Sequence, residues 1–113
     1  MAQFILLLRG GNELYEEYSE EEIRQAIQAY RQWAQDLQQA GKLVDAFKLA
    51  DGGRLMQKRD GQIQVDGPFA ETKETIGGYY LILAESYDEA LEVARDCPIF
   101  AEGGTVEIRQ IEE

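Results

Sequence analysis

The residues with the clearest chemical potential form one run near the middle of the chain, Asp66-Gly67-Pro68-Phe69-Ala70-Glu71-Thr72-Lys73-Glu74. A carboxylate such as that of Asp66 works as a general base near neutral pH when its site is partly buried. Glu71 and Glu74 can accept protons or hydrogen bonds, and Lys73 supplies the opposite charge. This pattern predicts a catalytic or ligand-binding loop with Asp66 as candidate base.

The same run also has a purely structural explanation. Asp66 can cap a turn through its own side chain, and Gly67 can adopt a positive φ. Pro68 holds φ near about −65°, which suits a tight turn. Both explanations stay open at the level of the sequence.

Composition narrows the possible chemistry. The chain has 113 residues with 22 Asp and Glu, 11 Lys and Arg, one Cys and no His. The lack of His excludes imidazole bases and His-ligated metals, and a lone Cys excludes an internal disulfide and a zinc site built from cysteines. A net charge of −11 argues against direct binding of nucleic acid. No stretch approaches the roughly 20 apolar residues of a membrane span. We therefore expect a soluble, cytoplasmic protein of one domain, residues 1–113, without a cofactor or a metal.

Apolar periodicity and turn residues predict the elements that must position these groups. Ser19 and Glu22 have the spacing of a capping box, and Gly41 is a natural end for the helix that follows. Tyr30 and Trp33 lie on the apolar stripe of that helix and are assigned to the core. The predicted strands cover 2–9, 43–50, 79–84 and 105–111, the helices 20–40 and 86–97, and a hairpin 54–58 with 62–65.

Without the hairpin, this order is βαββαβ, an α+β arrangement of the ferredoxin-like type. The first and third main strands are apolar on both faces, which is typical of central strands covered on both sides. Right-handed crossovers put both helices on one face, so the other face needs a different cover. The simplest cover is a second copy of the chain, and we expect a homodimer through the open sheet face.

This topology adds two residues to the candidate site. The third main strand runs antiparallel to the first, so the Asp66 run lies at the same end of the sheet as Arg9, which could bind an anionic group. Tyr79 and Tyr80 point to opposite faces of their strand, and Tyr80 is taken as a candidate ligand contact. Arg109 is expected at the opposite end and is left out of the site.

The run from Asp66 to Glu74 resembles the YCII-related proteins, in the subgroup named for its Asp-Gly-Pro-Phe motif. Further points of similarity are Gly77-Gly78-Tyr79-Tyr80, the Cys97-Pro98 pair and the closing Val106-Glu107-Ile108-Arg109. The resemblance implies a dimeric α+β barrel, and in some relatives a small-molecule lyase with a His–Asp pair. Only the Asp of that pair has a counterpart here, at Asp66.

Two hypotheses of different classes follow. The first is a protein that binds a small polar or anionic metabolite, and is possibly a cofactor-free lyase, with Asp66 as base and Arg9, Glu71, Lys73, Glu74 and Tyr80 as ligand contacts. The second is a non-enzymatic interaction or regulatory module, which the resemblance links to transcription initiation. An enclosed pocket would favour the first hypothesis, and a second apolar surface without a pocket would favour the other.

Overall fold

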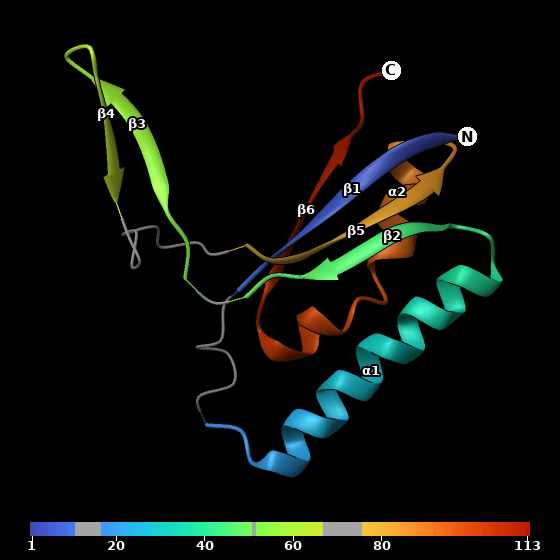
Figure 1. Cartoon of the computed structure of the whole chain (residues 1–113). Coiled ribbons are helices and arrows are strands. Elements are labelled where there is room, and N and C mark those ends of the chain that lie inside the picture. The colour runs from blue at the N-terminus through green and yellow to red at the C-terminus, as the bar shows by residue number, and fades with distance from the viewer. Residues whose placement is uncertain (11–16, 51, 67–75) are drawn as a thin grey trace.

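The computed structural model describes residues 1–10, 17–50, 52–66 and 76–113 (Figure 1). A four-stranded sheet, two helices, a short 3₁₀ helix and a separate hairpin make up this part of the chain. In chain order they are β1 (Ala2–Arg9), α1 (Glu20–Gln39), β2 (Leu43–Lys48), β3 (Leu55–Arg59), β4 (Gln62–Asp66), β5 (Ile76–Ala84), α2 (Tyr87–Ala94), η2 (Pro98–Glu102) and β6 (Thr105–Gln110).

The sheet is antiparallel with the strand order β2-β5-β1-β6. This is the order of the ferredoxin-like arrangement, and it confirms that the first and third main strands are central. The pairing of Leu6 with Tyr80 on one side and with Ile108 on the other sets the register across the middle of the sheet. The α+β class predicted from the sequence is therefore correct.

Helix α1 begins and ends where its local signals predict. The Ser19 hydroxyl accepts a hydrogen bond from the Glu22 amide, and the Glu22 carboxylate accepts one from the Ser19 amide, both at 3.1 Å. At the other end Gly41 has a φ of 71°, the left-handed conformation that allows the chain to leave the helix. The helix buries Trp33 and Leu37 against the sheet.

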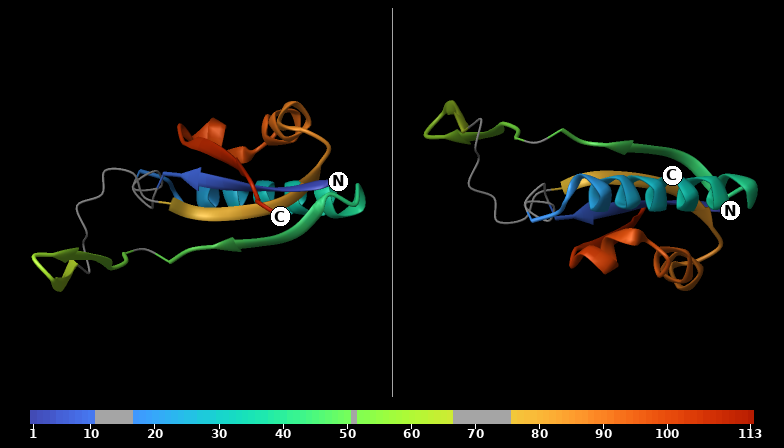
Figure 2. Two further views of the ribbon diagram at one scale, coloured as in Figure 1. Left: turned by 90° about the horizontal axis from the view of Figure 1, so that it is seen from above. Right: turned by 90° about the horizontal axis from the view of Figure 1, so that it is seen from below.

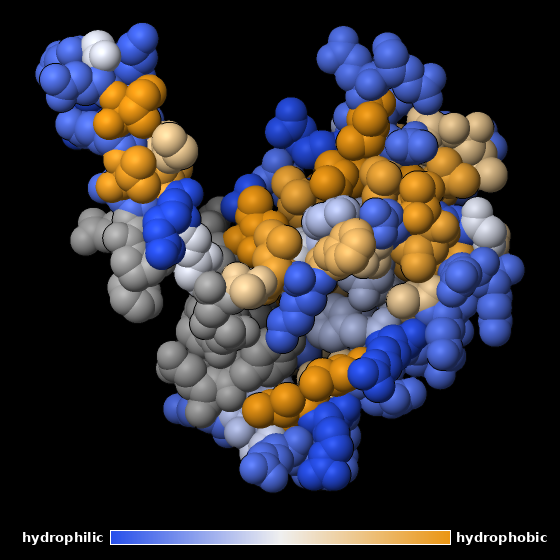
Figure 3. Space-filling model, viewed as in Figure 1, coloured by the Kyte–Doolittle hydropathy of each residue, from blue (hydrophilic) through white to orange (hydrophobic). Residues whose placement is uncertain are grey.

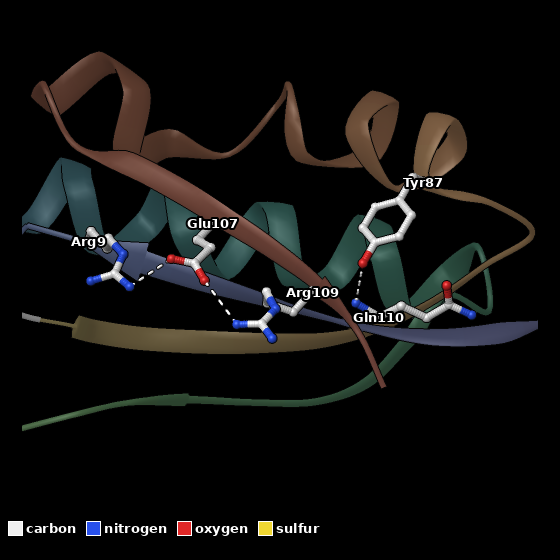
Figure 4. Close-up of polar contacts among 5 residues, drawn as sticks. All are labelled: Arg9, Tyr87, Glu107, Arg109 and Gln110. Atoms are coloured by element: carbon white, nitrogen blue, oxygen red, sulfur yellow. Dashed lines mark hydrogen bonds and ion pairs between the residues drawn. The ribbon is translucent and has the colours of Figure 1, made fainter. Parts of the chain in front are cut away.

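Both helices lie on the same face of the sheet, which holds the hydrophobic core. On the α1 side, the rings of Trp33 and Tyr80 are 4.5 Å apart. On the α2 side, the Tyr87 ring packs edge-on against Phe4 at 4.9 Å, and its hydroxyl accepts a hydrogen bond from the Gln110 amide at 2.9 Å (Figure 4). Alternate residues of the same strands point to the other face, which no described helix covers.

The hairpin β3–β4 forms a sheet of its own. Its turn residues Asp60 and Gly61 have φ values of 50° and 78°, as a two-residue hairpin turn of the primed type requires. The hairpin projects beyond the end of the main sheet (Figures 1 and 2). The radius of gyration is accordingly 16.0 Å, whereas a compact domain of this length has about 13 Å.

The third main strand differs from its prediction at its beginning. It starts at Ile76, so Gly77 and Gly78 lie inside β5 and not before it. A Cβ on Gly77 would lie 2.7 Å from the Gly10 carbonyl oxygen, and one on Gly78 would lie 2.9 Å from that of Phe47. These glycines therefore let β5 fit closely between its neighbours, a role that their turn-like appearance in the sequence concealed.

Candidate functional site

A largely apolar pocket of about 380 Å³ lies between α1 and the sheet. One side of α1 forms a wall, and the ends of β1, β2 and β5 form the opposite wall, with η2 contributing at its margin. Its lining residues are Leu8, Gly10, Ile23, Ala26, Ile27, Tyr30, Arg31, Ala34, Ala46, Phe47, Lys48, Leu49, Ala50, Ile76, Gly77, Gly78, Tyr80, Ile99 and Glu102. Its size and composition match those of sites for small organic molecules.

The absence of two side chains from β5 helps to leave this space open. Gly78 is buried and alternates with Tyr80 and Ile82 on the helix-facing side of the strand. Gly77 lies beside it in the lining. A larger residue at Gly78 would meet the backbone of β2 as well as the pocket. The glycine pair thus shapes the pocket and permits the close strand packing.

Polar groups are few, and they come from α1, β2, β5 and η2. The Tyr30 hydroxyl donates a hydrogen bond to the Glu102 carboxylate at 3.3 Å across the two elements. Arg31 and Lys48 add cationic side chains to the lining. An apolar body with one polar end is the ligand shape that such a lining would accept.

Tyr80 contributes a neutral phenol to the pocket wall. It is buried, and this burial raises its pKa to about 12, with a smaller effect from the neighbouring Cys97. The hydroxyl therefore keeps its proton at physiological pH and can donate a hydrogen bond. Cys97 is buried as well, and burial raises its pKa to about 11, so its thiol is not the nucleophile of this site.

Arg9, predicted to bind an anion beside Asp66, has a carboxylate partner on β6. Its guanidinium donates to Glu107 at 2.7 Å, and Arg109 lies 3.5 Å from the other oxygen of the same carboxylate (Figure 4). The hydrogen bond from Arg9, with the charge of both arginines, lowers the pKa of Glu107. Arg109 lies toward the other end of β6, where it pairs with Ile5, yet its long side chain reaches the Glu107 carboxylate that Arg9 also contacts.

Arg9 and Tyr80 lie on opposite faces of the sheet. Glu107 alternates along β6 with Val106 and Ile108, which pack against the core, so the arginine cluster belongs to the open face. Tyr80 faces α1. The two predicted ligand contacts therefore do not share one cavity within a single chain, and their roles in binding stay predictions.

Asp66 is the last residue of β4, where it pairs with Leu55. Its side chain is exposed, and the described residues form no enclosure around it. Glu71, Lys73 and Glu74 lie outside the described residues. The role of Asp66 as base stays a prediction, since the described part of one chain does not supply the partial burial on which it depends.

Comparison with known proteins assigns the chain to a family. The sequence profile of the YCII-related domain matches residues 9–113. The chain belongs to the YCII-related family. Within 61 residues it is 46% identical to the uncharacterized protein R00369 of Rhizobium meliloti (strain 1021), and the match covers 51% of this chain and 49% of that protein. The chain thus matches about half the length of this curated relative.

A solved structure supports the fold of this YCII-related chain. It is the 5-chloro-2-hydroxyhydroquinone dehydrochlorinase from Burkholderia phenoliruptrix AC1100, in complex with 2,5-dihydroxybenzoquinone. The TM-score is 0.58 at 15% identity, and the match covers 100% of this chain and 95% of the other. At this level of identity the likeness concerns the fold alone.

The sequence interpretation missed most of the pocket. Tyr30 was assigned to the core, yet it is only half-buried and lines the pocket with Ile23 and Ile27, which are 37% and 43% exposed. An apolar stripe on a helix predicts contact with the sheet but not where that contact stops. No sequence pattern marked Glu102 as a pocket residue, because its position in η2 depends on how the chain returns from α2.

Two further features, a metal-binding cluster and a membrane-spanning helix, are absent from the residues that the structure describes. Among these residues, no group of three or more acidic or cysteine side chains is arranged to hold a metal ion. Neither α1 nor any other helix of the described chain is long and apolar enough to cross a membrane.

Proposed function

We propose that this YCII-related protein binds a small, mostly apolar molecule with one polar end in the pocket between α1 and the sheet. The observation that carries the proposal is the pocket of about 380 Å³ with its apolar walls. The sequence led us to expect a polar or anionic metabolite. The composition of the pocket favours a mostly apolar ligand, and Arg31 in its lining could pair with an anionic group of that ligand. The run at 66–74 further supports placement in the Asp-Gly-Pro-Phe subgroup.

Binding would use two kinds of contact. Removal of apolar ligand surface from water between α1 and β5 would supply most of the affinity. The Tyr30–Glu102 pair and the neutral phenol of Tyr80 would orient the polar end by hydrogen bonds. An aromatic ring with hydroxyl or carbonyl groups at one edge satisfies both requirements.

The ligand named for the structural neighbour provides a first probe. 2,5-Dihydroxybenzoquinone, present in the complex of the dehydrochlorinase, is a single ring with polar edges. Its oxygens lie around the whole ring, so phenol, with a single hydroxyl group, matches the proposed ligand better, and hydroquinone, with hydroxyl groups at both ends, is the intermediate case. All three can be titrated against the full chain by ligand-detected NMR.

A matched pair of substitutions on α1 tests the site. Ala34 lines the pocket, whereas Ala29 is exposed on another side of the same helix. We expect Ala34→Phe to fill the pocket and to weaken binding of the best probe by about tenfold or more, as loss of a buried contact of 1–3 kcal/mol would. Ala29→Phe should leave binding unchanged. Equal effects of the two substitutions, or no binding of any probe, would show that the pocket is not a ligand site.

We further propose that the bound molecule undergoes a lyase-type elimination without a cofactor. Support comes from the structural neighbour, which is named as a dehydrochlorinase. Asp66 is the predicted base. For this role, residues outside the β3–β4 hairpin must complete the site around its carboxylate. Asp66→Asn should abolish turnover while it leaves probe binding unchanged. Full turnover in Asp66→Asn would remove this residue from the mechanism, and the Tyr30–Glu102 pair would then be the next proton-transfer candidate.

We also propose a homodimer through the open sheet face. This face carries half-buried apolar residues from the central strands, including Leu7, Tyr79 and Leu81, with Phe47 58% exposed beside them. Apolar surface gathers over the sheet in Figure 3. Leu81→Arg should convert the dimer to a monomer in sedimentation equilibrium. A wild-type chain that sediments as 12.8 kDa at micromolar concentration would refute the dimer.

A further inference from the structure

The hairpin β3–β4 has one apolar face and one polar face. Met56 pairs with Val65, and Lys58 pairs with Ile63, on one face of the ribbon. The other face carries Gln57, Arg59, Gln62 and Gln64, together with Leu55 and Asp66 at the base. Met56, Ile63 and Val65 are 64%, 59% and 56% exposed. We call the hairpin β3–β4 the arm, and we call these three side chains its apolar face.

This apolar face has no partner among the described residues of its own chain. The arm projects past the end of the main sheet (Figure 2), and its apolar residues stand apart from those of the sheet in Figure 3. A two-stranded hairpin is marginally stable in water without a packing partner. The alternation of apolar and polar residues over both strands therefore indicates a surface that is buried by another body.

The charge of the arm suits an acidic partner. Residues 54–66 hold three of the 11 Lys and Arg residues and only two of the 22 Asp and Glu residues. The arm is thus slightly basic on a chain whose net charge is −11. A second copy of the chain is an acidic partner as a whole, and Lys58 is the basic residue that lies on the same face of the ribbon as Met56, Ile63 and Val65.

The direction of the arm also fits a second copy. In Figure 2 the arm lies toward the side of the sheet opposite to α2 and the 3₁₀ helix η2, which is the side of the open face. A chain seated on that face would lie next to the apolar face of the arm. The two apolar surfaces would then form one continuous interface.

We infer that the β3–β4 hairpin is a dimerisation arm whose apolar face, Met56, Ile63 and Val65, packs on a second copy of this chain. The inference rests on the proposed homodimer through the open sheet face and adds a second contact to it. By two-fold symmetry each copy gives one arm and receives one.

Two matched double substitutions on β4 test the arm. Sedimentation equilibrium of the full chain measures the dimer dissociation constant of each variant. Ile63→Lys with Val65→Lys adds two charges to the apolar face, and Gln62→Lys with Gln64→Lys adds the same charges to the polar face. Each pair puts one new Lys opposite a basic residue and one opposite a neutral residue. We expect the first pair to raise the dimer dissociation constant about 100-fold, as loss of interface anchors does, and the second to change it less than about threefold. Circular dichroism checks that the main sheet stays folded in both.

The possible outcomes distinguish failure of the arm inference from failure of the proposed open-face dimer. If Leu81→Arg disrupts the dimer but both β4 pairs leave it intact, the arm inference is wrong and the open-face dimer stands. If the wild-type chain is a monomer, both proposals fail. A dimer weakened equally by the two β4 pairs would also overturn the inference, because the effect would not depend on the apolar face.

A second measurement does not rely on any variant. In a dimer mixed from isotope-labelled and unlabelled chains, filtered NOEs report contacts between different chains. We expect such NOEs from the methyl groups of Ile63 and Val65 to the unlabelled chain. NOEs from these methyl groups only to protons of the same chain would show that the arm folds back on itself, and would refute the inference.

Discussion

The two faces of the main sheet are built from alternate residues of the same strands, yet they differ in what they require. On the helix-facing side Phe4, Leu6 and Ile82 are 1%, 0% and 0% exposed. On the open side the neighbouring residues Leu7 and Leu81 are only half-buried. Backbone geometry and hydrogen bonding are common to both faces. The difference therefore comes from the helices, which bring a complete cover to one side and none to the other.

The helix-facing side holds the core on which folding depends, whereas the open side is the surface proposed for association. The helix-facing side also contains the pocket and the neutral phenol of Tyr80. The open side combines apolar residues with the Arg9–Glu107–Arg109 cluster. A buried charge requires partners, and the cluster supplies its own partners beside the apolar residues. The open side thus combines apolar side chains with a charged cluster, which is the composition that the proposed dimer interface would have.

The largest predicted effect tests this division directly. Leu6→Ala removes a side chain with no exposed surface and should lower the free energy of unfolding by about 2–5 kcal/mol. Leu7→Ala, the adjacent residue on the open side, should lower it by about 1 kcal/mol at concentrations where the chain is a monomer. Urea denaturation at several protein concentrations measures both. Equal losses would mean that the open face is as tightly packed as the core.

A smaller effect should appear at alkaline pH. Burial raises the pKa of Tyr80 from 10.0 to about 12 and that of Cys97 from 9.0 to about 11. Both groups hold their protons more tightly in the folded chain than in the unfolded chain. Their contribution to stability is therefore complete below pH 9 and is lost as the pH rises toward 12.

Substitution of each tyrosine of β5 assigns this pH dependence to one face. Tyr80→Phe should make the fall in the urea midpoint above pH 10 less steep. Tyr79→Phe is the control, because Tyr79 lies beside Phe47 on the open side. If the pH profiles of the two variants coincide, Tyr80 is not the source of the alkaline loss.

The smallest effect is expected at the arginine cluster. The hydrogen bond from Arg9 lowers the pKa of Glu107, so the stabilisation from this carboxylate is present above its ordinary pKa of 4.5 and is lost as the pH falls through the lowered value. Glu107→Gln should slightly lower the urea midpoint at pH 7, and the difference should vanish in acid and shrink with salt. Glu112→Gln, with the same change of charge, serves as control. A deficit that persists in acid would indicate a packing role.

Local signals predicted the elements well because their causes are local. The capping box at Ser19 and the turn at Asp60-Gly61 act within a few residues, and the alternation along 105–111 shows a strand covered on one side. The apolar runs of β1 and β5 indicated central strands, and the topology confirms them. The start of β5 was missed because glycines that permit close packing look like glycines that form turns.

The candidate site was predicted less well, and for a physical reason. The placement of Arg9 beside Asp66 stays a prediction, and no sequence pattern indicated its contact with Glu107, a residue 98 positions away that only sheet pairing brings near. The role of Tyr80 as a ligand contact stays a prediction, and its place in the pocket wall depends on where α1 lies. The exposure of the apolar face of the arm could not be predicted, because strand pattern alone does not show what packs on it.

The amino-acid sequence alone determined the order of the elements, the central strands, the acidic character and the absence of histidine chemistry. These properties follow from composition and from interactions between near neighbours. Only the tertiary structure decided which face of the sheet holds the pocket, that Tyr30 and Glu102 meet there, and that the hairpin leaves the body of the domain. Such features depend on how distant segments pack, since a cavity or an uncovered face is the space that several elements leave between them.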